Sequence, residues 1–378
     1  MSSPSAALVT PFPGGMPLLG IEREVYELAS GLVSRHWDVE VITTEALWKG
    51  HLPAYASTST VPGTGITRLR GHLASHLQGI QASGAPCIVP ALRNTVLEHD
   101  VAIYFNAGWP VTLSLAGLPH RGQPSLYRTY WHPAFGRHHL LNRAREYSAL
   151  IPLRRCQTLL VPTIAEIDLL SRRMPPQVKL ILVEAGTTVP PMPSPAARID
   201  LRRQYSISEE ALVLIQIGQI SSFKGTQAAI AAARLLSDSG EDVTLLLVGR
   251  ECEEPSLSRL VKSAVQRGLV RALGPIDDEE KSSLLHLSDV LVMVSHYEAY
   301  GFVAIEALAH GVVPVIYEDF PAAATLLQRG AVGVPRLGGV KALADAIRRA
   351  KRSEIGESQR SWDEYVVEVD HELRSLLG

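Results

Sequence analysis

The chain has 378 residues, of which 46% are hydrophobic and 20% charged, and its formal net charge is -2. That length suggests about two or three domains, and the balanced charge gives no reason to expect nucleic acid as the main partner. The three cysteines, Cys87, Cys156 and Cys252, are far apart, and the chain has neither a signal-like N-terminus nor an apolar run of spanning length, so we expect a cytoplasmic protein without disulfides.

Short apolar runs predict strands along the first half of the chain. In Gly20–His36, between the first two runs, apolar residues recur at helical spacing and predict a helix. Residues 45–98 show no clear period. The expected strands are Ala6–Thr10, Val39–Thr43, Val101–Phe105, Leu126–Trp131, Thr158–Val161 and Lys179–Val183.

The second half repeats this alternation of strands and helices. Its apolar runs are rich in Val, Ile and Leu without strict alternation, which is typical of parallel strands buried on both faces. Two such blocks predict an α/β protein with two doubly wound domains. The expected strands are Leu212–Ile217, Val243–Val248, Val290–Val294 and Val312–Ile316, and the expected helices are Thr226–Ser237, Leu257–Gln266, Phe302–His310, Val340–Ala350 and Ser361–Leu377.

A proline-rich segment separates the two blocks. Val189–Ser194 reads Val-Pro-Pro-Met-Pro-Ser, and its prolines oppose regular structure and suit a linker. The alternative is a surface loop within one domain. We place the boundary between residues 188 and 189.

Two strand-to-helix turns carry residues that suit an anion. Gly14 and Gly15 follow the first expected strand, and backbone amides without side chains over them can approach a phosphate. Leu18 and Leu19 break the GxGxxG pattern, which lowers the odds of a nicotinamide or flavin enzyme. Lys224 lies in the turn after Leu212–Ile217, where its ammonium group can pair with a diphosphate. A plain tight turn and a solvated lysine are the alternatives.

The segment from Glu298 to Glu306 is the most informative in the chain. Gly301 lies between these two acids, and a helix that begins there would offer free N–H groups to a phosphate. The two carboxylates would span about 12 Å if helical, which suits holding two parts of one long ligand better than a hydrolytic pair. Alternatively, Glu298 is a capping acid and Glu306 an exposed helix residue.

These residues resemble a known family. Glu298-Ala-Tyr-Gly-Phe-Val-Ala-Ile-Glu306 and the residues up to Val315 resemble the E-x7-E segment of retaining GT-B glycosyltransferases, specifically those of glycosyltransferase family 4. Weaker similarities extend over nearly the whole length. They are Pro13-Gly14-Gly15 with the family's Gly-Gly segment, Gly218 and Lys224-Gly225 with its "GR…KG" loop, Leu246–Gly249 with its next strand, and Trp362 with the aromatic of its final helix.

The resemblance implies a GT-B architecture, in which two Rossmann-like domains face each other across a cleft. Residues 1–188 would form the acceptor-side domain and residues 189–360 the domain that binds the nucleotide sugar. A C-terminal helix, residues 361–378, would pack back on the first domain.

The resemblance also implies roles for single residues. Glu306 would hold the ribose hydroxyls, and Glu298 would bind hydroxyls of the donor sugar. His132, in Tyr130-Trp131-His132-Pro133, would be the cleft histidine near the reacting sugar, although a lone histidine can equally be structural. The expected catalytic residues are thus Glu298, Lys224 and His132, and the expected donor-binding residues are Gly14, Gly15, Gly218, Gln219, Lys224, Tyr300, Gly301, Phe302, Val303 and Glu306.

The sequence departs from the family in three places. Gln219 stands where the family usually has an arginine, so either Lys224 alone faces the diphosphate or another arginine, such as Arg250, replaces it. Ile316–Pro321 replaces a Gly-Gly turn with a following acid. The middle of the N-terminal domain, where acceptors bind in the family, matches no known pattern.

The expected activity is therefore a retaining transfer of a hexose-type sugar from a UDP- or GDP-linked donor to an acceptor hydroxyl. In the family's usual account, the leaving phosphate accepts the acceptor's proton on the same face of the sugar. We expect no metal or other cofactor, because Asp277-Asp278 fits the start of a helix. The alternatives are a nucleotide-sugar epimerase and a nucleotide-sugar-binding protein without turnover.

The sugar, the base, the linkage and the oligomeric state are left open, and so is the acceptor, which is a sugar, a lipid-linked sugar or a small molecule. A basic stretch, Phe135–Cys156, suggests weak peripheral contact with the inner face of the membrane. A solvated basic face or an acceptor-side wall is the other interpretation of that stretch.

Overall fold

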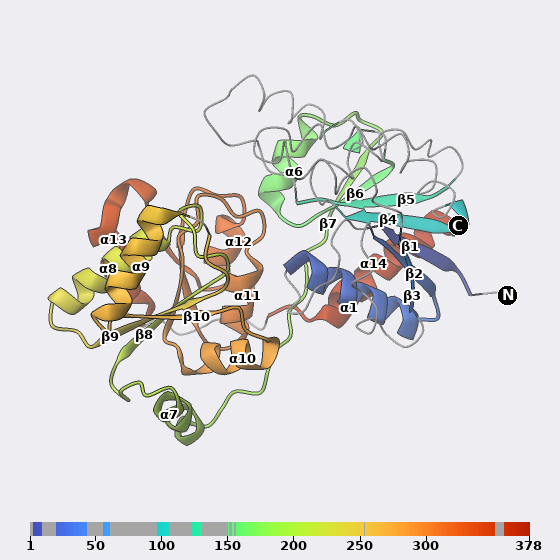
Figure 1. The fold of residues 1–378 in the computed structure, drawn as a ribbon. Helices are drawn as coiled ribbons and strands as arrows, with labels where there is room; N and C mark the ends of the chain where they lie inside the picture. The colour runs from blue at the N-terminus through green and yellow to red at the C-terminus, as the bar shows by residue number, and fades with distance from the viewer. Residues whose placement is uncertain are drawn as a thin grey trace. The chain divides into compact units, whose positions relative to one another are not determined.

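The computed structural model describes residues 3–9, 20–43, 56–60, 97–105, 123–130, 150, 153–154, 156–252, 254–351 and 359–378. The chain forms two compact units (Figure 1). Unit 1 comprises Met1–Gly186 together with Trp362–Gly378, and unit 2 comprises Thr187–Ser361. The chain therefore passes from one unit to the other after residue 186 and returns after residue 361.

Unit 1 is built on a parallel sheet of seven strands in the order β3-β2-β1-β4-β5-β6-β7. The order reverses between β1 and β4, as in doubly wound folds. The strands are β1 (Ser5–Val9), β2 (Asp38–Thr43), β3 (Ala56–Thr60), β4 (Val101–Phe105), β5 (Ser125–Arg128), β6 (Thr158–Val161) and β7 (Lys179–Leu182).

Consecutive residues of each strand belong to different hydrophobic cores, because side chains alternate between the two faces of a sheet. Leu8 and Ile103 belong to a core with α1 (Gly20–Ser34) and α14 (Trp362–Leu377). Ala7 and Ala102 belong to a second core, which includes Leu170 of α6 (Ile164–Ser171). Both faces of the sheet are thus buried, and this explains the continuous apolar runs of the sequence.

The C-terminal helix α14 packs against α1 in unit 1 (Figure 1). Tyr365, Val366 and Val369 of α14 are buried in the same core as α1. Gly31 allows the close approach, because a Cβ atom there would lie 2.5 Å from both γ-methyl carbons of Val366. The last helix of the chain is therefore part of the first unit.

Unit 2 contains a parallel sheet of six strands in the order β10-β9-β8-β11-β12-β13. The switch in strand order lies between β8 and β11, and in such sheets ligands bind beyond the carboxyl ends of the strands at this point. The strands are β8 (Leu212–Ile217), β9 (Val243–Val248), β10 (Val270–Gly274), β11 (Val290–Met293), β12 (Val313–Tyr317) and β13 (Val332–Val334).

Helices cover both faces of this sheet. Alternate strand residues such as Leu214 and Val292 share a core with α8, α9 and α13, whereas α10 and α11 contact β8 and β11 outside that core (Figure 1). The helices of unit 2 are α7 (Pro195–Gln204), α8 (Thr226–Asp238), α9 (Pro255–Gln266), α10 (Asp278–Leu287), α11 (Phe302–Ala309), α12 (Ala323–Gln328) and α13 (Gly339–Ala350), with a short 3-10 turn, η3 (Arg336–Gly338).

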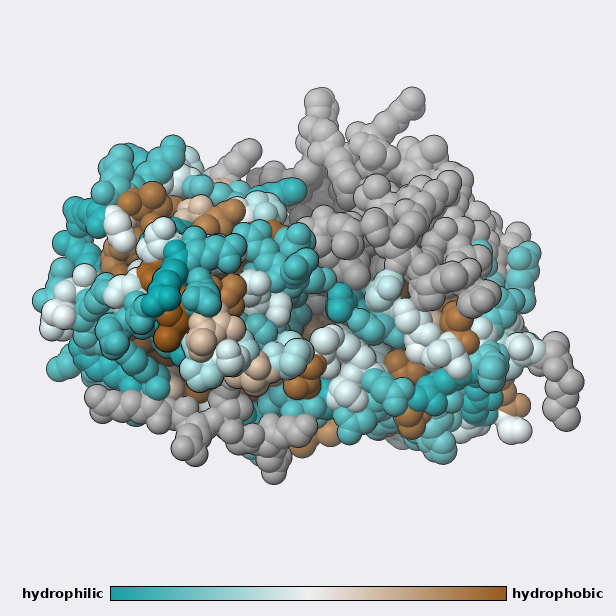
Figure 2. Space-filling view, turned by 90° about the horizontal axis from the view of Figure 1, so that it is seen from below, coloured by the Kyte–Doolittle hydropathy of each residue, from teal (hydrophilic) through white to brown (hydrophobic). Residues whose placement is uncertain are grey.

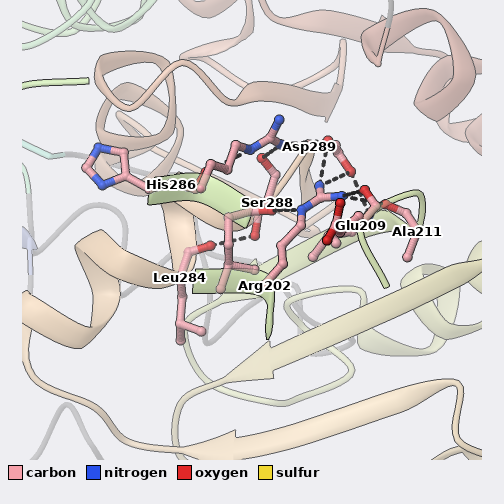
Figure 3. A network of polar contacts seen from close by, with 10 residues as sticks. Arg202, Glu209, Ala211, Leu284, His286, Ser288 and Asp289 are labelled. Atoms are coloured by element: carbon pink, nitrogen blue, oxygen red, sulfur yellow. Dashed lines mark hydrogen bonds and ion pairs between the residues drawn. The ribbon is translucent and has the colours of Figure 1, made fainter. Parts of the chain in front are cut away.

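A polar network fixes α7, the first helix of unit 2 (Figure 3). The guanidinium group of the buried Arg202 donates to both carboxylate oxygens of Asp289, at 3.0 and 2.9 Å, and to the carbonyl oxygens of Leu287, Glu209 and Ala211. Asp289 in turn accepts from the backbone N–H of Val213 at the start of β8. This network holds α7, the helix that follows the proline-rich segment, to the sheet.

All ten expected strands correspond to observed strands, nine of them over most of their length, but three other strands were missed. The polar β3 lay in the stretch without a clear period, and β10 and β13 were not predicted at all. The expected strand Leu126–Trp131 is shorter, because β5 ends at Arg128. Helices α6, α7 and α12 were also not predicted.

The visible surface of the described residues is mixed in character. On the face in Figure 2, hydrophobic residues are interrupted by hydrophilic ones. No helix among the described residues is long and apolar enough to cross a membrane. Of the basic stretch, residues 135–149 lie outside the described part, and Arg154 donates to the carbonyl oxygen of Arg173 in unit 1.

Candidate functional site

Two loops at the carboxyl ends of β8 and β11 bring Lys224 and Glu298 together. The Nζ atom of Lys224 lies 2.7 Å from Oε1 of Glu298, and both side chains are partly exposed. The hydroxyl group of Ser295 donates to the same carboxylate oxygen at 2.7 Å. The two charged residues that the sequence singled out are therefore ion-paired at the switch point of the sheet.

The loop that carries Lys224 has little freedom. At Gly225, with φ of 73°, a Cβ atom would lie 2.1 Å from the carbonyl oxygen of Val294. The side-chain amide of Gln216 donates to the carbonyl oxygen of Lys224 at 2.9 Å. The carboxylate of Glu254 accepts from both the backbone N–H and the hydroxyl group of Ser222. The turn is thus packed against β11 and held from α9.

The loop that carries Glu298 is joined to the first one and leads into α11. The backbone N–H of His296 donates to the carbonyl oxygen of Phe223 at 2.8 Å. Gly301 is the N-cap of α11 with φ of 82°, and a Cβ atom there would lie 3.1 Å from Leu326 and 3.3 Å from Met293. Gly301 provides no side-chain cap for α11, and the N-terminus of a helix attracts anions through its dipole and backbone amides.

Glu306 lies in the second turn of α11 and pairs with a lysine of α10. The Nζ atom of Lys281 lies 3.1 Å from Oε1 of Glu306 and 3.0 Å from Oδ1 of Asp278. Burial lowers the pKa of Lys281, but the two carboxylates more than offset this, and its pKa is raised. Lys281 therefore stays protonated and holds the Glu306 carboxylate in place.

A neutral histidine supports the same part of α11. The Nδ1 atom of His310 lies 2.7 Å from the carbonyl oxygen of Glu306, and its Nε2 atom lies 2.9 Å from the hydroxyl oxygen of Ser282 on α10. Burial lowers the pKa of His310 to about 4, and nearby His286 and Lys281 add to this. The ring thus links α10 and α11 in its uncharged form.

Arg336 occupies the edge of the sheet where the sequence departs from the family. Its guanidinium group forms a two-point ion pair with Asp319, at 2.6 and 2.7 Å, and stacks 4.2 Å above the Tyr317 ring centroid. It also donates to the carbonyl oxygens of Ser295 and His296. Arg336 thus joins the loops after β11 and β12. Arg336 was not predicted from the sequence, and its only signal was the departure from the family at Tyr317–Asp319.

The structure places the remaining expected residues as follows. Gln219 is exposed, Gly218 has a positive φ of 130°, and Val303 is partly buried in the first turn of α11. The buried Tyr300 packs edge-on against Phe302, with ring centroids 5.0 Å apart. Gly14, Gly15 and His132 lie outside the described residues.

Possible metal ligands were also compared with the expectation. Asp277 is the N-cap of α10, and its carboxylate accepts from the backbone N–H of Glu280 at 2.8 Å. Asp278 pairs with Lys281. Among the residues that the structure describes, no three His, Cys, Asp or Glu side chains group as metal ligands would.

Comparison with known proteins identifies the part of the chain that carries this site. Residues 197–368 match the family model described as glycosyl transferases group 1. Unit 2 is therefore the part of the chain that is similar to group 1 glycosyltransferases. The match covers every strand of unit 2 and reaches into α14.

Two characterised proteins resemble part of the chain. The alpha-D-kanosaminyltransferase of Streptomyces kanamyceticus is 28% identical over 139 residues, which are 37% of this chain and 36% of that protein. The N-acetyl-alpha-D-glucosaminyl L-malate synthase of Bacillus anthracis is 32% identical over 158 residues, which are 41% and 40% of the two chains. The chain thus spans well under half the length of these relatives.

Solved structures resemble the chain over its whole length. Sucrose-phosphate synthase from Thermosynechococcus elongatus superposes with a TM-score of 0.76 and 18% identity, covering 99% of both chains. Anabaena Alr3699/HepE, solved in complex with UDP and glucose, gives a TM-score of 0.70 with 17% identity, covering 98% of this chain and 99% of the other. This similarity confirms the expected α/β fold with its two doubly wound domains.

Proposed function

We propose that the protein is a retaining glycosyltransferase, which moves a hexose-type sugar from a UDP- or GDP-linked donor to an acceptor hydroxyl. The pairing of Lys224 with Glu298 at the switch point, beside the open start of α11, carries this proposal. A cation, a carboxylate and the N-terminus of a helix suit the diphosphate and the sugar hydroxyls of one donor molecule. The group 1 family match and the UDP and glucose of the Anabaena neighbour support this donor class.

The described residues suggest what each part of the site does. The bond between the anomeric carbon and the diphosphate breaks, and negative charge builds on the leaving phosphate. Lys224 and the first N–H groups of α11 would stabilise that charge. Glu306, held by Lys281, would accept hydrogen bonds from the ribose hydroxyls, and Glu298 from the sugar hydroxyls.

In the proposed reaction, the acceptor oxygen bonds to the anomeric carbon on the face that the diphosphate leaves. The leaving phosphate oxygen takes the acceptor's proton, so atoms and charge balance without a protein nucleophile. The charge stabilisation that a metal provides in other transferases would come from Lys224 and α11. We therefore propose that neither a metal nor another cofactor takes part.

Donor hydrolysis tests this function without knowledge of the acceptor. The protein is incubated with UDP- and GDP-linked hexoses, with and without EDTA, and free sugar and nucleotide are followed by NMR. We expect slow release of a sugar whose anomeric configuration equals that of the donor, unaffected by EDTA. An inverted product would contradict retention, and conversion of the donor to an epimer would favour the epimerase alternative.

A binding measurement separates a silent nucleotide-sugar-binding protein from an enzyme. If the wild-type protein binds a nucleoside diphosphate sugar but neither hydrolyses it nor transfers it to any acceptor pool, turnover is absent. Glu306→Ala is the informative variant, because its truncated side chain cannot reach a ribose. If Glu306→Ala binds nucleotide as tightly as the wild type, the role proposed for Glu306 is wrong.

A further inference from the structure

Gln219 and Arg250 are neighbours on adjacent backbone segments at the candidate site. The backbone N–H of Ile220 donates to the carbonyl oxygen of Arg250 at 2.9 Å, and that of Cys252 donates to the carbonyl oxygen of Ile220 at 3.0 Å. This pattern pairs Ile220 with Glu251 in parallel register. Gln219 and Arg250, each one residue earlier, are consequently side by side, with backbones about 4.8 Å apart.

Two glycines bring these segments unusually close just before the pair. A Cβ atom on Gly249 would lie 1.9 Å from the carbonyl oxygen of Gly218, so only glycine fits there. Gly218 itself faces Lys224, whose Cε atom would lie 3.9 Å from a Cβ atom on Gly218. Arg250 is therefore the residue after Gly249, which contacts the loop of Lys224 at Gly218.

The side chain of Arg250 is exposed and unpaired among the described residues, so it can bind a ligand. Successive side chains on extended backbone point to opposite sides, so Gln219 and Arg250 share the side opposite Ile220, which is buried in the core. Arg250 is exposed, and its side chain makes no hydrogen bond or ion pair with any residue that the structure describes. Its guanidinium group is free to form a two-point contact with phosphate.

The charge balance of the site calls for a second cation. A diphosphate carries a negative charge on each phosphate group, and a further charge develops when it leaves. Lys224 lies 2.7 Å from Glu298, so together they contribute no net charge. With Gln219 uncharged, the described residues of the two loops offer no other cation that borders Gly218.

We propose that Arg250 binds the donor diphosphate and replaces, from the neighbouring segment, the arginine that the family has at position 219. This inference rests on the proposed function, because it assumes a diphosphate in the same site. It assigns the phosphate contact to the loop after β9 rather than to the loop after β8. The proposed cation thus comes from the backbone segment that pairs with the one carrying Gln219.

A charge-relocation experiment tests this assignment by calorimetric binding of UDP, GDP, UMP and GMP. We compare the wild type, Arg250→Gln, the double variant Gln219→Arg/Arg250→Gln, and Arg267→Gln as a matched control. Arg267 is also exposed and lies at the far end of α9. Because Arg250 is exposed, its substitution disturbs no packing, and equal melting temperatures would verify this.

We expect Arg250→Gln to weaken binding of the preferred nucleoside diphosphate by roughly tenfold or more, the effect of losing one charge-assisted contact. The double variant should regain affinity to within about threefold of the wild type, and Arg267→Gln should bind normally. If Arg250→Gln binds as tightly as the wild type, the assignment to Arg250 is wrong although the proposed function stands. If the wild type binds no nucleoside diphosphate, the proposed function fails and this inference with it.

Discussion

The Nζ atom of Lys224 and the Oε1 atom of Glu298 are 2.7 Å apart, although 74 residues separate them in the sequence. Each residue comes from a loop that follows a strand beside the switch point of unit 2. The cation proposed for the diphosphate is paired with the carboxylate proposed for the sugar. Donor binding would therefore have to share or exchange this contact.

This arrangement predicts opposite effects for the two residues on nucleotide binding. Lys224→Met should weaken binding of the nucleoside diphosphate and lower donor turnover on the order of 100-fold, because a charge partner of the leaving group is lost. Glu298→Gln should also lower turnover. It should leave nucleoside diphosphate binding unchanged or slightly tighter, because Lys224 is released from its partner.

Calorimetry with the nucleoside diphosphate and the donor-hydrolysis rate together measure both effects. Gln266→Ala, exposed at the end of α9, is a control that changes no charge. A Glu298→Gln protein that loses nucleotide affinity as strongly as Lys224→Met would contradict the proposed division of roles.

Lys281 predicts a defect in nucleotide binding that depends on Glu306. Lys281→Met should weaken nucleotide binding by about tenfold, because the Glu306 carboxylate loses the contact that orients it. In a Glu306→Gln background the same change should have little further effect, since the two residues act as a pair. Affinities of the four proteins form a double-mutant cycle, and additive losses would show that Lys281 acts elsewhere. Lys262→Met on the exposed side of α9 is the control.

His310 predicts a loss of stability in mild acid. Its pKa is lowered to about 4 in the folded protein, whereas an unfolded histidine has a pKa near 6.5. Between these values the unfolded chain binds the proton and the folded chain does not, so stability falls as the pH drops from about 6.5 to about 4.

Between pH 7 and pH 5 this residue should cost on the order of 2 kcal/mol of unfolding free energy. His310→Gln keeps hydrogen-bonding groups but does not titrate, so its loss over the same interval should be smaller by that amount. Urea titrations of both proteins at the two pH values measure the difference. Equal losses would mean that His310 is not buried in its neutral form.

Two glycines give a matched test of how tightly the Lys224 loop is packed. Gly225 and Gly240 both have positive φ, at 73° and 91°, but only Gly225 lacks room for a Cβ atom. Gly240→Ala should cost about 1 kcal/mol from backbone strain alone. Gly225→Ala should cost roughly 3 kcal/mol or more, because the loop must move away from Val294. Thermal unfolding compares them, and equal shifts would contradict the close packing.

A buried ion pair in unit 1 predicts the largest effects on stability. Arg128 and Glu24 are both fully buried, and Nε of Arg128 lies 2.7 Å from Oε1 of Glu24. Replacing either one alone, as in Arg128→Met or Glu24→Gln, should cost about 3–5 kcal/mol, because a buried charge is left uncompensated. The exposed pair Arg203–Glu209 is the control, and Arg203→Ala should cost less than about 1 kcal/mol. Similar costs for the two sites would refute this account.

The central strands were predictable from sequence, whereas three of the four edge strands, β3, β10 and β13, were not. β4, β8 and β9 are buried along nearly their whole length and therefore consist of apolar residues. The edge strand β10 is buried only at Val270 and contains Arg271, and the edge strand β13 has three residues. A strand covered on fewer sides needs fewer apolar residues, so its signal is weak.

In the candidate site, local sequence predicts some residues, whereas their partners are distant in the sequence. The sequence identifies Lys224, Gly301 and Glu298 because each lies in a strand-to-helix loop that the surrounding residues predict. The partners that hold them do not, because Lys281 is 25 residues from Glu306, and Arg336 is 40 residues from His296. Long-range pairs of charged residues carry no local pattern, so the structure was needed to find them.

The return of the chain to unit 1 affects the order in which the protein can be assembled during synthesis. Unit 2 is one continuous segment, so all of it has been made before α14 leaves the ribosome. Until then, the apolar stripe of α1 lacks Tyr365, Val366 and Val369, which complete its core. Unit 1 is therefore synthesised first but completed last. Its uncovered apolar surface on α1 must be kept from aggregating while unit 2 folds.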